Sequence, residues 1–328
     1  MRQSTRRRRR SSLTGYAAAA AAAVLAVCGS GSASAATPGN VTAGGTTVGA
    51  RAGAGAPGQA DVLSAPTLVA HSVLGDVGYR EVGEGSPILL VMGYGGSMDD
   101  WAPSFVDALA AHHRVIVFDN AGVGRTSALP APLTVSAMAD QTSALISSLR
   151  LHRPAVLGWS MGGMIAQALA VRHPGQVGRL VLTATQAGTG RSLPVPPAAA
   201  AALNSPIPAV ELSVLFPGDQ TAAARAYAGG ILQYPNFYRA SDVVKNAQTG
   251  AVQQWMAGAE PAGRQVGRIR TPILVADGTL DALDPTANDV ILTHSLRRAG
   301  LALYPDAGHA FLFQDAAEFV PAVDRFVS

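Results

Sequence analysis

The sequence predicts an α/β fold, with a mostly parallel eight-stranded sheet flanked by helices and a mainly helical lid insertion. Short, wholly apolar runs recur along the chain, as expected of strands that are buried on both faces. Stretches with helical periodicity alternate with these runs, which favours parallel strands connected by helices. One interval of about 85 residues, between Thr185 and Arg270, has no clear buried strand and is too long for an ordinary connection. We interpret that interval as the lid.

The expected strands are short and are separated by turns or helices. They span Leu68–Val73, Val77–Val82, Ile88–Val91, Val115–Phe118, Ala155–Leu157, Leu180–Leu182, Ile273–Val275 and Leu301–Leu303. The expected helices span Pro103–Ala111, Val135–Leu149, Met164–Arg172, Pro285–Arg298 and Ala316–Phe326. The first two strands are separated by Gly75-Asp76, a pair that is typical of a turn.

The N-terminal residues 1–35 are typical of an export signal. Arg6–Arg10 form a charged region, and Ala17–Val27 form an apolar region that is too short to span a bilayer. Two processing sites fit equally well. One is ordinary cleavage after Ala35, and the other is a lipobox-like site that would leave a lipidated Cys28 at the mature N-terminus.

The composition changes after residue 35 and again after residue 60, and these changes indicate the domain boundaries. Residues 36–60 consist largely of Gly, Ala, Thr and Pro, and we interpret them as a flexible linker because they cannot bury enough apolar surface. Residues 61–328 form the folded domain, with its lid at about 186–268. We expect an exported protein, either extracellular or held in the cell envelope. If it is attached to a membrane, we expect a lipid on Cys28 to be its one link.

Charge and cysteine usage narrow the classes of partner. The net charge is +3, but Arg2 and Arg6–Arg10 supply six positive charges, which leaves about −3 for the remainder. The folded part therefore has no basic signature for nucleic acid, and we expect a small-molecule substrate. Cys28 is the only cysteine, so no intramolecular disulfide can form. We expect no cofactor and no metal.

A nucleophile motif lies between an expected strand and an expected helix, in the run Gly158-Trp159-Ser160-Met161-Gly162-Gly163. G-x-S-x-G in that setting is typical of a sharp turn that exposes a serine hydroxyl at the top of a sheet. Glycine at positions 158 and 162 avoids side-chain collisions across the turn. Ser160 would lie at a helix N-terminus, which favours developing negative charge.

A serine nucleophile needs a general base, and the base needs an acid that orients it. In this arrangement the acid and then the histidine follow the serine along the chain. Three histidines follow Ser160. We assign His173 to the end of the helix after the serine and His294 to a helix on the flank of the sheet. His309 lies in a loop directly after an expected strand, where a base should be, and is the predicted base.

Three aspartates follow the expected strand Ile273–Val275. Asp277 stands at the end of the strand, where Gly278 begins a turn, and is interpreted as a turn residue. Asp284 precedes Pro285, a position typical of a helix N-cap. Asp281 lies a few residues beyond the strand and is the predicted acid.

An oxyanion intermediate needs two hydrogen-bond donors. We expect one to be the backbone N–H of Met161, directly after the nucleophile. The other should come from the glycine-rich loop Met92–Gly96, which follows an expected strand, and we nominate the N–H of Tyr94. A phosphate-binding loop is the weaker interpretation, because G-x-x-x-x-G-K-[ST] is absent.

From about Leu68 to its end the chain resembles the α/β-hydrolase superfamily, above all its lidded esterase, lactonase and cofactor-free haloperoxidase-like members. The matching residues are Gly93–Gly96, Asp119–Ser127, Gly158–Gly163, Asp281 and Gly308-His309. The resemblance implies Ser160 as nucleophile, His309 as base, Asp281 as acid, and Tyr94 and Met161 as oxyanion donors.

Two details of the resemblance bear on the site. Met92 stands where the family often has histidine before the oxyanion loop, which affects the packing of the loop rather than its backbone donor. Ser160 argues against the members that use an aspartate nucleophile, the epoxide hydrolases and haloalkane dehalogenases. The Asp119 loop is interpreted as structural, with its glycines making a turn beside the site.

The reaction we expect is hydrolysis of an ester-like bond in a small or medium apolar substrate, through an acyl-enzyme on Ser160. The alternatives are a perhydrolase or haloperoxidase-like activity with the same triad, and a non-catalytic binding protein of the same fold. Nine apolar residues of the lid either line the substrate pocket or pack the lid onto the sheet: Leu212, Val214, Leu215, Phe216, Ile231, Leu232, Tyr234, Phe237 and Tyr238.

Overall fold

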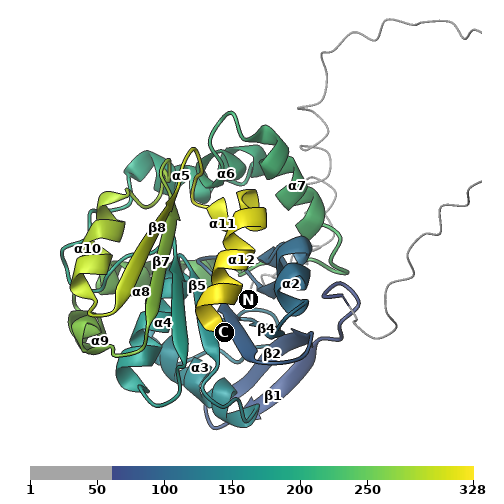
Figure 1. The fold of residues 1–328 in the computed structure, drawn as a ribbon, viewed down its shortest axis with the longest axis vertical. Helices are drawn as coiled ribbons and strands as arrows, with labels where there is room; N and C mark the ends of the chain where they lie inside the picture. Colours follow the sequence, from purple (N-terminus) through teal and green to yellow (C-terminus); the bar gives the residue numbers. More distant parts are fainter. Residues whose placement is uncertain (1–60) are drawn as a thin grey trace, which may run out of the picture.

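A computed structural model describes residues 61–328 (Figure 1). The predicted export signal (residues 1–35, including Cys28) and the predicted linker (36–60) lie outside these described residues. Within residues 61–328, the longest and most apolar helices still fall short of what is needed to cross a bilayer.

Eight strands form one sheet in the order β1-β2-β4-β3-β5-β6-β7-β8. The β1–β2 and β2–β4 pairs are antiparallel, and all other neighbours are parallel. The strands are β1 (Leu68–Ser72), β2 (Gly75–Val82), β3 (Pro87–Val91), β4 (Arg114–Phe118), β5 (Ala155–Trp159), β6 (Arg179–Thr183), β7 (Ile273–Gly278) and β8 (Ala299–Tyr304). The predicted fold class, with its mostly parallel eight-stranded sheet, is confirmed.

Helices cover both faces of the sheet (Figure 1). The helices on the body are α2 (Pro103–Ala110), α3 (Val135–Ser148), α4 (Met161–Arg172), α10 (Ala287–Ser295), α11 (Phe311–Gln314) and α12 (Ala316–Val327), with a short 3-10 helix, η1 (Met98–Asp100). In β3, Ile88 and Leu90 pack into the cluster under α2, α11 and α12, whereas Leu89 and Val91 pack into the cluster under α3, α4 and α10. Burial on both faces explains why the strand is an unbroken apolar run.

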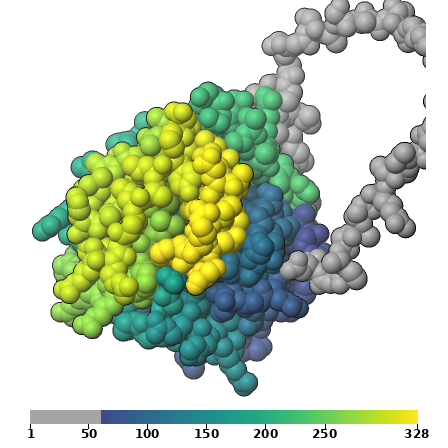
Figure 2. All heavy atoms as spheres, viewed as in Figure 1, coloured from purple at the N-terminus to yellow at the C-terminus, as the bar shows by residue number. Residues whose placement is uncertain are grey.

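The segment between β6 and β7 contains helices and no strand. These are α5 (Pro197–Leu203), α6 (Pro208–Leu215), α7 (Thr221–Ile231), α8 (Asp242–Met256), α9 (Pro261–Arg264) and the 3-10 helix η2 (Val266–Arg268). Helices α5, α6 and α7 lie beyond one end of the sheet (Figure 1). In the space-filling view the green part of this segment is in contact with the yellow C-terminal helices (Figure 2).

Tyrosine hydroxyl groups attach this segment to the loop around η1 and to the loop after β4. Tyr227 donates to the carbonyl oxygen of Asp100 at 3.0 Å, and Tyr234 donates to that of Trp101 at 3.0 Å. The hydroxyl of Tyr238 donates to the carboxylate of Asp119 at 2.6 Å. The segment is therefore held to the body at buried points close to the ends of β3 and β4.

One expected helix begins later than predicted. The sequence indicated a helix from Pro285 to Arg298, but α10 begins at Ala287 and ends at Ser295. Its N-cap residue is Thr286, so the assignment of Asp284 as an N-cap is wrong. The carboxylate of Asp284 instead accepts hydrogen bonds from the side-chain amides of Gln186 and Asn288, at 2.8 and 2.7 Å.

Candidate active site

Ser160 occupies a strained turn between β5 and α4. Its φ is 56° and its ψ is −121°, a conformation that a non-glycine residue seldom adopts without a functional reason. Glycines make the turn feasible: a Cβ on Gly158 would lie 2.3 Å from the carbonyl oxygen of Gly162, and one on Gly162 would lie 1.9 Å from that of Val91. The sharp turn leaves Ser160 on the wall of a cavity.

His309 and Asp281 form a buried hydrogen-bonded pair. His309 lies in the loop between β8 and α11, and its Nδ1 is 2.6 Å from Oδ2 of Asp281. The other carboxylate oxygen of Asp281 accepts the amides of Leu283 and Asp284, at 2.7 and 2.8 Å. Because the carboxylate accepts the Nδ1 proton, Nε2 of a neutral His309 is left as a proton acceptor.

The pKa of His309 is shifted by opposing effects. Burial alone lowers it, but the negative charge of Asp281, the hydrogen bond to Asp281 and the charge of Asp284 raise it, and the pKa ends above its usual 6.5. This environment stabilises the imidazolium that would form if His309 accepted a proton from the serine.

Trp159, the residue before Ser160, contacts the histidine loop directly. Its indole N–H donates to the carbonyl oxygen of His309 at 2.9 Å, and the two rings lie 5.8 Å apart. The strand that carries the serine therefore also fixes the loop that carries the histidine.

The loop after β3 approaches the serine closely. A Cβ on Gly93 would lie 3.3 Å from the Cβ of Ser160, so only a glycine fits here without displacing its neighbours. Within residues 61–328, the backbone N–H groups of Tyr94 and Met161 donate to no other backbone or side-chain group. The next amide along, that of Gly95, donates to Oε1 of Gln248 at 2.8 Å.

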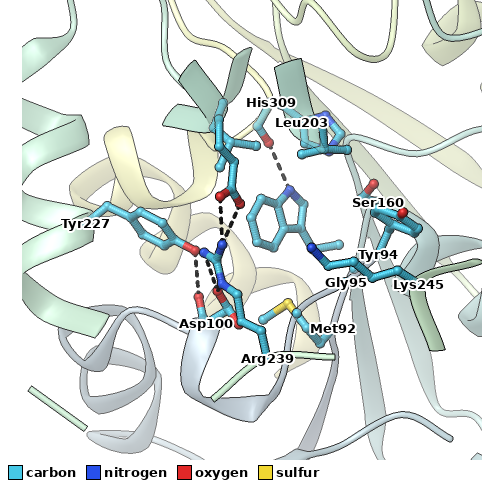
Figure 3. Close-up of a pocket in the computed structure, with 15 residues that line it drawn as sticks. Met92, Tyr94, Gly95, Asp100, Ser160, Leu203, Tyr227, Arg239, Lys245 and His309 are labelled. Atoms are coloured by element: carbon cyan, nitrogen blue, oxygen red, sulfur yellow. Dashed lines mark hydrogen bonds and ion pairs between the residues drawn. The ribbon is translucent and has the colours of Figure 1, made fainter. Parts of the chain in front are cut away.

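Ser160 and His309 line two adjoining compartments. The larger has a volume of about 530 Å³ and is mainly apolar, with walls that include Met164, Val195, Leu203, Val252, Met256 and Leu283. The smaller has a volume of about 50 Å³ and contains charged side chains (Figure 3). Asp281 lies behind His309 and contacts it from outside the compartments. The predicted nucleophile, base and oxyanion donors thus line these two compartments, and the predicted acid lies behind the base.

Three further aspartates lie buried near Asp281. Asp277, Asp284 and Asp289 each place a carboxylate oxygen within 4.8 Å of the other two. Burial and then neighbouring carboxylates raise the pKa of Asp284 to about 7 and that of Asp289 to about 8. Oxygen ligands of this kind suit a hard cation, and in the absence of a cation the raised pKa values favour protonated carboxyl groups.

The structure adds residues to the site that the sequence analysis did not single out. Gln248 and Lys245 on α8 and Arg239 before it reach the cavity or its loop. Lys245 could have been noticed from the sequence alone, because it is the only lysine in the chain. Of the nine apolar lid residues named in the sequence analysis, only Leu215 lines a compartment together with Ser160.

Comparison with known proteins places this geometry in a family. A family model described as the alpha/beta hydrolase fold matches residues 86–209. "Putative carbamate hydrolase RutD" of Caulobacter sp. (strain K31) is 30% identical over 254 residues, which cover 74% of this chain and 90% of that protein. The chain belongs to the α/β-hydrolase family. This hydrolase is also similar to "Poly(3-hydroxyalkanoate) depolymerase" of Ectopseudomonas oleovorans, at 30% identity over 74% of this chain and 84% of that one.

A solved structure agrees with this placement of the hydrolase. The "Alpha/beta hydrolase fold protein from Chitinophaga pinensis" superposes with a TM-score of 0.72 at 26% identity. The match covers 82% of this chain and 99% of that chain. The likeness therefore extends well beyond the residues matched by the family model.

Proposed function

We propose that this α/β hydrolase cleaves an ester-like bond of a small or medium apolar substrate through an acyl-enzyme on Ser160. The observation that carries the proposal is the shared cavity. Ser160 lies there on a strained turn and shares both compartments with His309, whose Nδ1 is bound by Asp281 and whose Nε2 can accept a proton. A nucleophile, a base and an orienting acid are the parts that acyl transfer needs.

In the acylation step His309 Nε2 takes the proton of the Ser160 hydroxyl as Oγ attacks the carbonyl carbon of the substrate. The negative charge moves to the carbonyl oxygen, where the N–H groups of Tyr94 and Met161 stabilise it. The carbonyl then re-forms, the bond to the leaving oxygen breaks, and His309 returns its proton to that oxygen. The products are a free alcohol and an ester of Ser160.

Deacylation repeats the sequence with water. His309 removes a proton from a water molecule, whose oxygen attacks the acyl carbon, and Ser160 leaves as its Oγ recovers that proton. The acid is released and the enzyme returns to its starting state. Asp281 keeps its charge in both steps and stabilises the imidazolium form of His309.

The larger compartment supports an apolar substrate. Its volume of about 530 Å³ and its methionine, leucine and valine walls suit an acyl chain or an apolar alcohol. Because a similar protein bears the name carbamate hydrolase, a carbamate belongs beside esters, lactones and amides in the substrate panel.

The test compares wild type, Ser160→Ala and Ser192→Ala on that panel. Ser192 also lines the larger compartment and donates to the carbonyl oxygen of Ala187, so it controls for the loss of a hydroxyl. We expect Ser160→Ala to lose turnover of a short-chain nitrophenyl ester by about 10³-fold or more, and Ser192→Ala to retain it. Undiminished turnover in a folded Ser160→Ala variant would refute the proposal.

A further inference from the structure

The smaller compartment beside Ser160 differs in character from the apolar one. It has a volume of about 50 Å³, enough for a group of a few heavy atoms and too little for an acyl chain. Its walls include the charged residues Asp100, Glu211, Arg239 and Lys245 (Figure 3). A compartment of this kind selects a small polar group on the substrate.

Three of these charged residues, Asp100, Glu211 and Arg239, pair with one another. The Arg239 guanidinium donates to a carboxylate oxygen of Asp100 at 2.8 Å and to both carboxylate oxygens of Glu211, at 2.8 and 2.7 Å. The nearby negative charge of Asp100 raises the pKa of Arg239, so the guanidinium stays charged. The three residues together carry one net negative charge, and their polar atoms are directed at each other rather than at a substrate.

Lys245 is the cation that this network leaves unpaired. It projects from α8 with its stem against the oxyanion loop, since a Cβ on Gly95 would lie 3.2 Å from its Cε. Within residues 61–328 its ammonium group forms no ion pair and no hydrogen bond. Figure 3 shows the ammonium group of Lys245 directed into the cavity.

We propose that Lys245 binds a carboxylate of the substrate in the smaller compartment, while the apolar part of the substrate lies in the larger one. The substrate class is then an ester that also carries a carboxylate, such as a monoester of a dicarboxylic acid. This inference rests on the proposed function, because Ser160 and Lys245 must act on one molecule.

Electrostatics favour a small anion over other guests. A half-buried ammonium group with three unused donors gains from an anion, because the pairing replaces water that the cavity partly excludes. A cationic guest would meet the charge of Lys245, and the carboxylates of Asp100 and Glu211 are already taken by Arg239. With Lys245 included, the charged walls sum to zero, so a carboxylate faces no net repulsion.

The kinetic test uses two matched pairs of esters. In the first pair, 4-nitrophenyl hydrogen adipate is compared with its neutral methyl ester, which places the charge on the acyl side. In the second pair, 3-carboxyphenyl hexanoate is compared with its methyl ester, which places the charge on the alcohol side. The variants are Lys245→Met, Lys245→Arg and, as control, Arg225→Met, which removes a cation from exposed α7 outside both compartments.

We expect wild type to prefer the charged member of at least one pair, and Lys245→Met to lower kcat/KM for that member about tenfold. The loss on the neutral member should be several-fold smaller than the loss on the charged member, Lys245→Arg should keep most of the preference, and Arg225→Met should change neither. Equal losses on both members in Lys245→Met, or no preference for charge in wild type, overturn the inference.

A binding measurement separates this inference from the proposed function. The dissociation constant of adipate is measured by calorimetry on Ser160→Ala with and without Lys245→Met. A dissociation constant about tenfold higher in the double variant supports the carboxylate site. If wild type then hydrolyses no ester, the proposed function alone fails. Equal binding by both proteins overturns the carboxylate site even if esters are hydrolysed.

Discussion

The side-chain oxygen of Gln248 accepts a hydrogen bond from the backbone amide of Gly95 at 2.8 Å. The two residues are 153 positions apart, and Gln248 is completely buried. The bond connects helix α8 to the Met92–Gly96 loop. In that loop the amide of Tyr94, the residue before Gly95, is the proposed oxyanion donor. The segment between β6 and β7 thereby positions part of the site as well as enclosing it.

Replacement of Gln248 should therefore impair catalysis more than binding. In Gln248→Ala the Gly95 amide loses its acceptor, so the loop is free to shift and the Tyr94 donor is misplaced. We expect kcat to fall by about tenfold or more with a much smaller change in KM, because the oxyanion forms only in the transition state. Steady-state kinetics on a nitrophenyl ester measure this.

Gln254→Ala on the same helix is the matched control for Gln248, because Gln254 lines neither compartment, and it should leave kcat within about twofold. Gln248→Glu keeps an oxygen acceptor and should retain more activity than Gln248→Ala. A rise in KM as large as the fall in kcat for Gln248→Ala would contradict a role in positioning the oxyanion loop.

The Asp281–His309 pair predicts a pH profile. His309 must be neutral to act as a base, so kcat/KM should rise with pH through the pKa of His309, which lies above 6.5. In Asp281→Asn the charge that raises this pKa is gone while burial still lowers it, so the acidic limb should move to lower pH. The rate on the plateau should fall by about 10³ to 10⁴-fold, because the orientation and charge stabilisation of His309 are lost.

Asparagine keeps the acceptor for the amides of Leu283 and Asp284, so the fold should persist in Asp281→Asn. Near-UV circular dichroism checks this, and a profile recorded from pH 5 to 9 checks the shift of the limb. An acidic limb that stays at the wild-type pH would show that Asp281 does not control the titration of His309.

The raised pKa of buried Asp289 makes the stability of the folded protein depend on pH. Its pKa is raised to about 8 in the folded protein by burial and by Asp284, so the folded state holds a proton that the unfolded state releases near pH 4. Stability from this group is complete below about pH 4 and decreases as the pH rises towards 8. Asp289→Asn removes this dependence.

We therefore expect Asp289→Asn to raise Tm by about 3 °C or more at pH 8.5, and to give little difference from wild type at pH 5. Thermal unfolding at the two pH values, with and without a chelator, provides the measurement. A fall in wild-type Tm on chelation, together with a lower Tm in Asp289→Asn, would instead indicate a bound cation among the three aspartates.

The sheet was predictable because its strands are buried on both faces. In β3 every residue after Pro87 is apolar and buried, so the pattern was visible without any structure. The G-x-S-x-G run was equally clear, because steric limits at the turn require glycine at 158 and 162. The order of Asp281 and His309 along the chain then followed from the arrangement typical of that motif, in which the acid and then the histidine come after the serine.

The segment between β6 and β7 was much less predictable. Helices α5 and α8 each bury only a few side chains, so their sequences lack a strong apolar period. The contacts of Gln248 and Lys245 with the Gly95 loop depend on tertiary packing between distant parts of the chain. Local rules also failed at Asp284, where a residue before proline suggested an N-cap but the helix begins at Ala287.

The proposed mechanism requires that Ser160 becomes covalently acylated. Wild type and Ser160→Ala are treated with a fluorophosphonate probe, and the adduct is located by mass spectrometry of the peptides. A single adduct on Ser160, absent from Ser160→Ala and formed more slowly in the presence of an excess of an ester substrate, is the predicted result. An intact wild-type protein that remains unlabelled, or that is labelled at another residue, would contradict the claim.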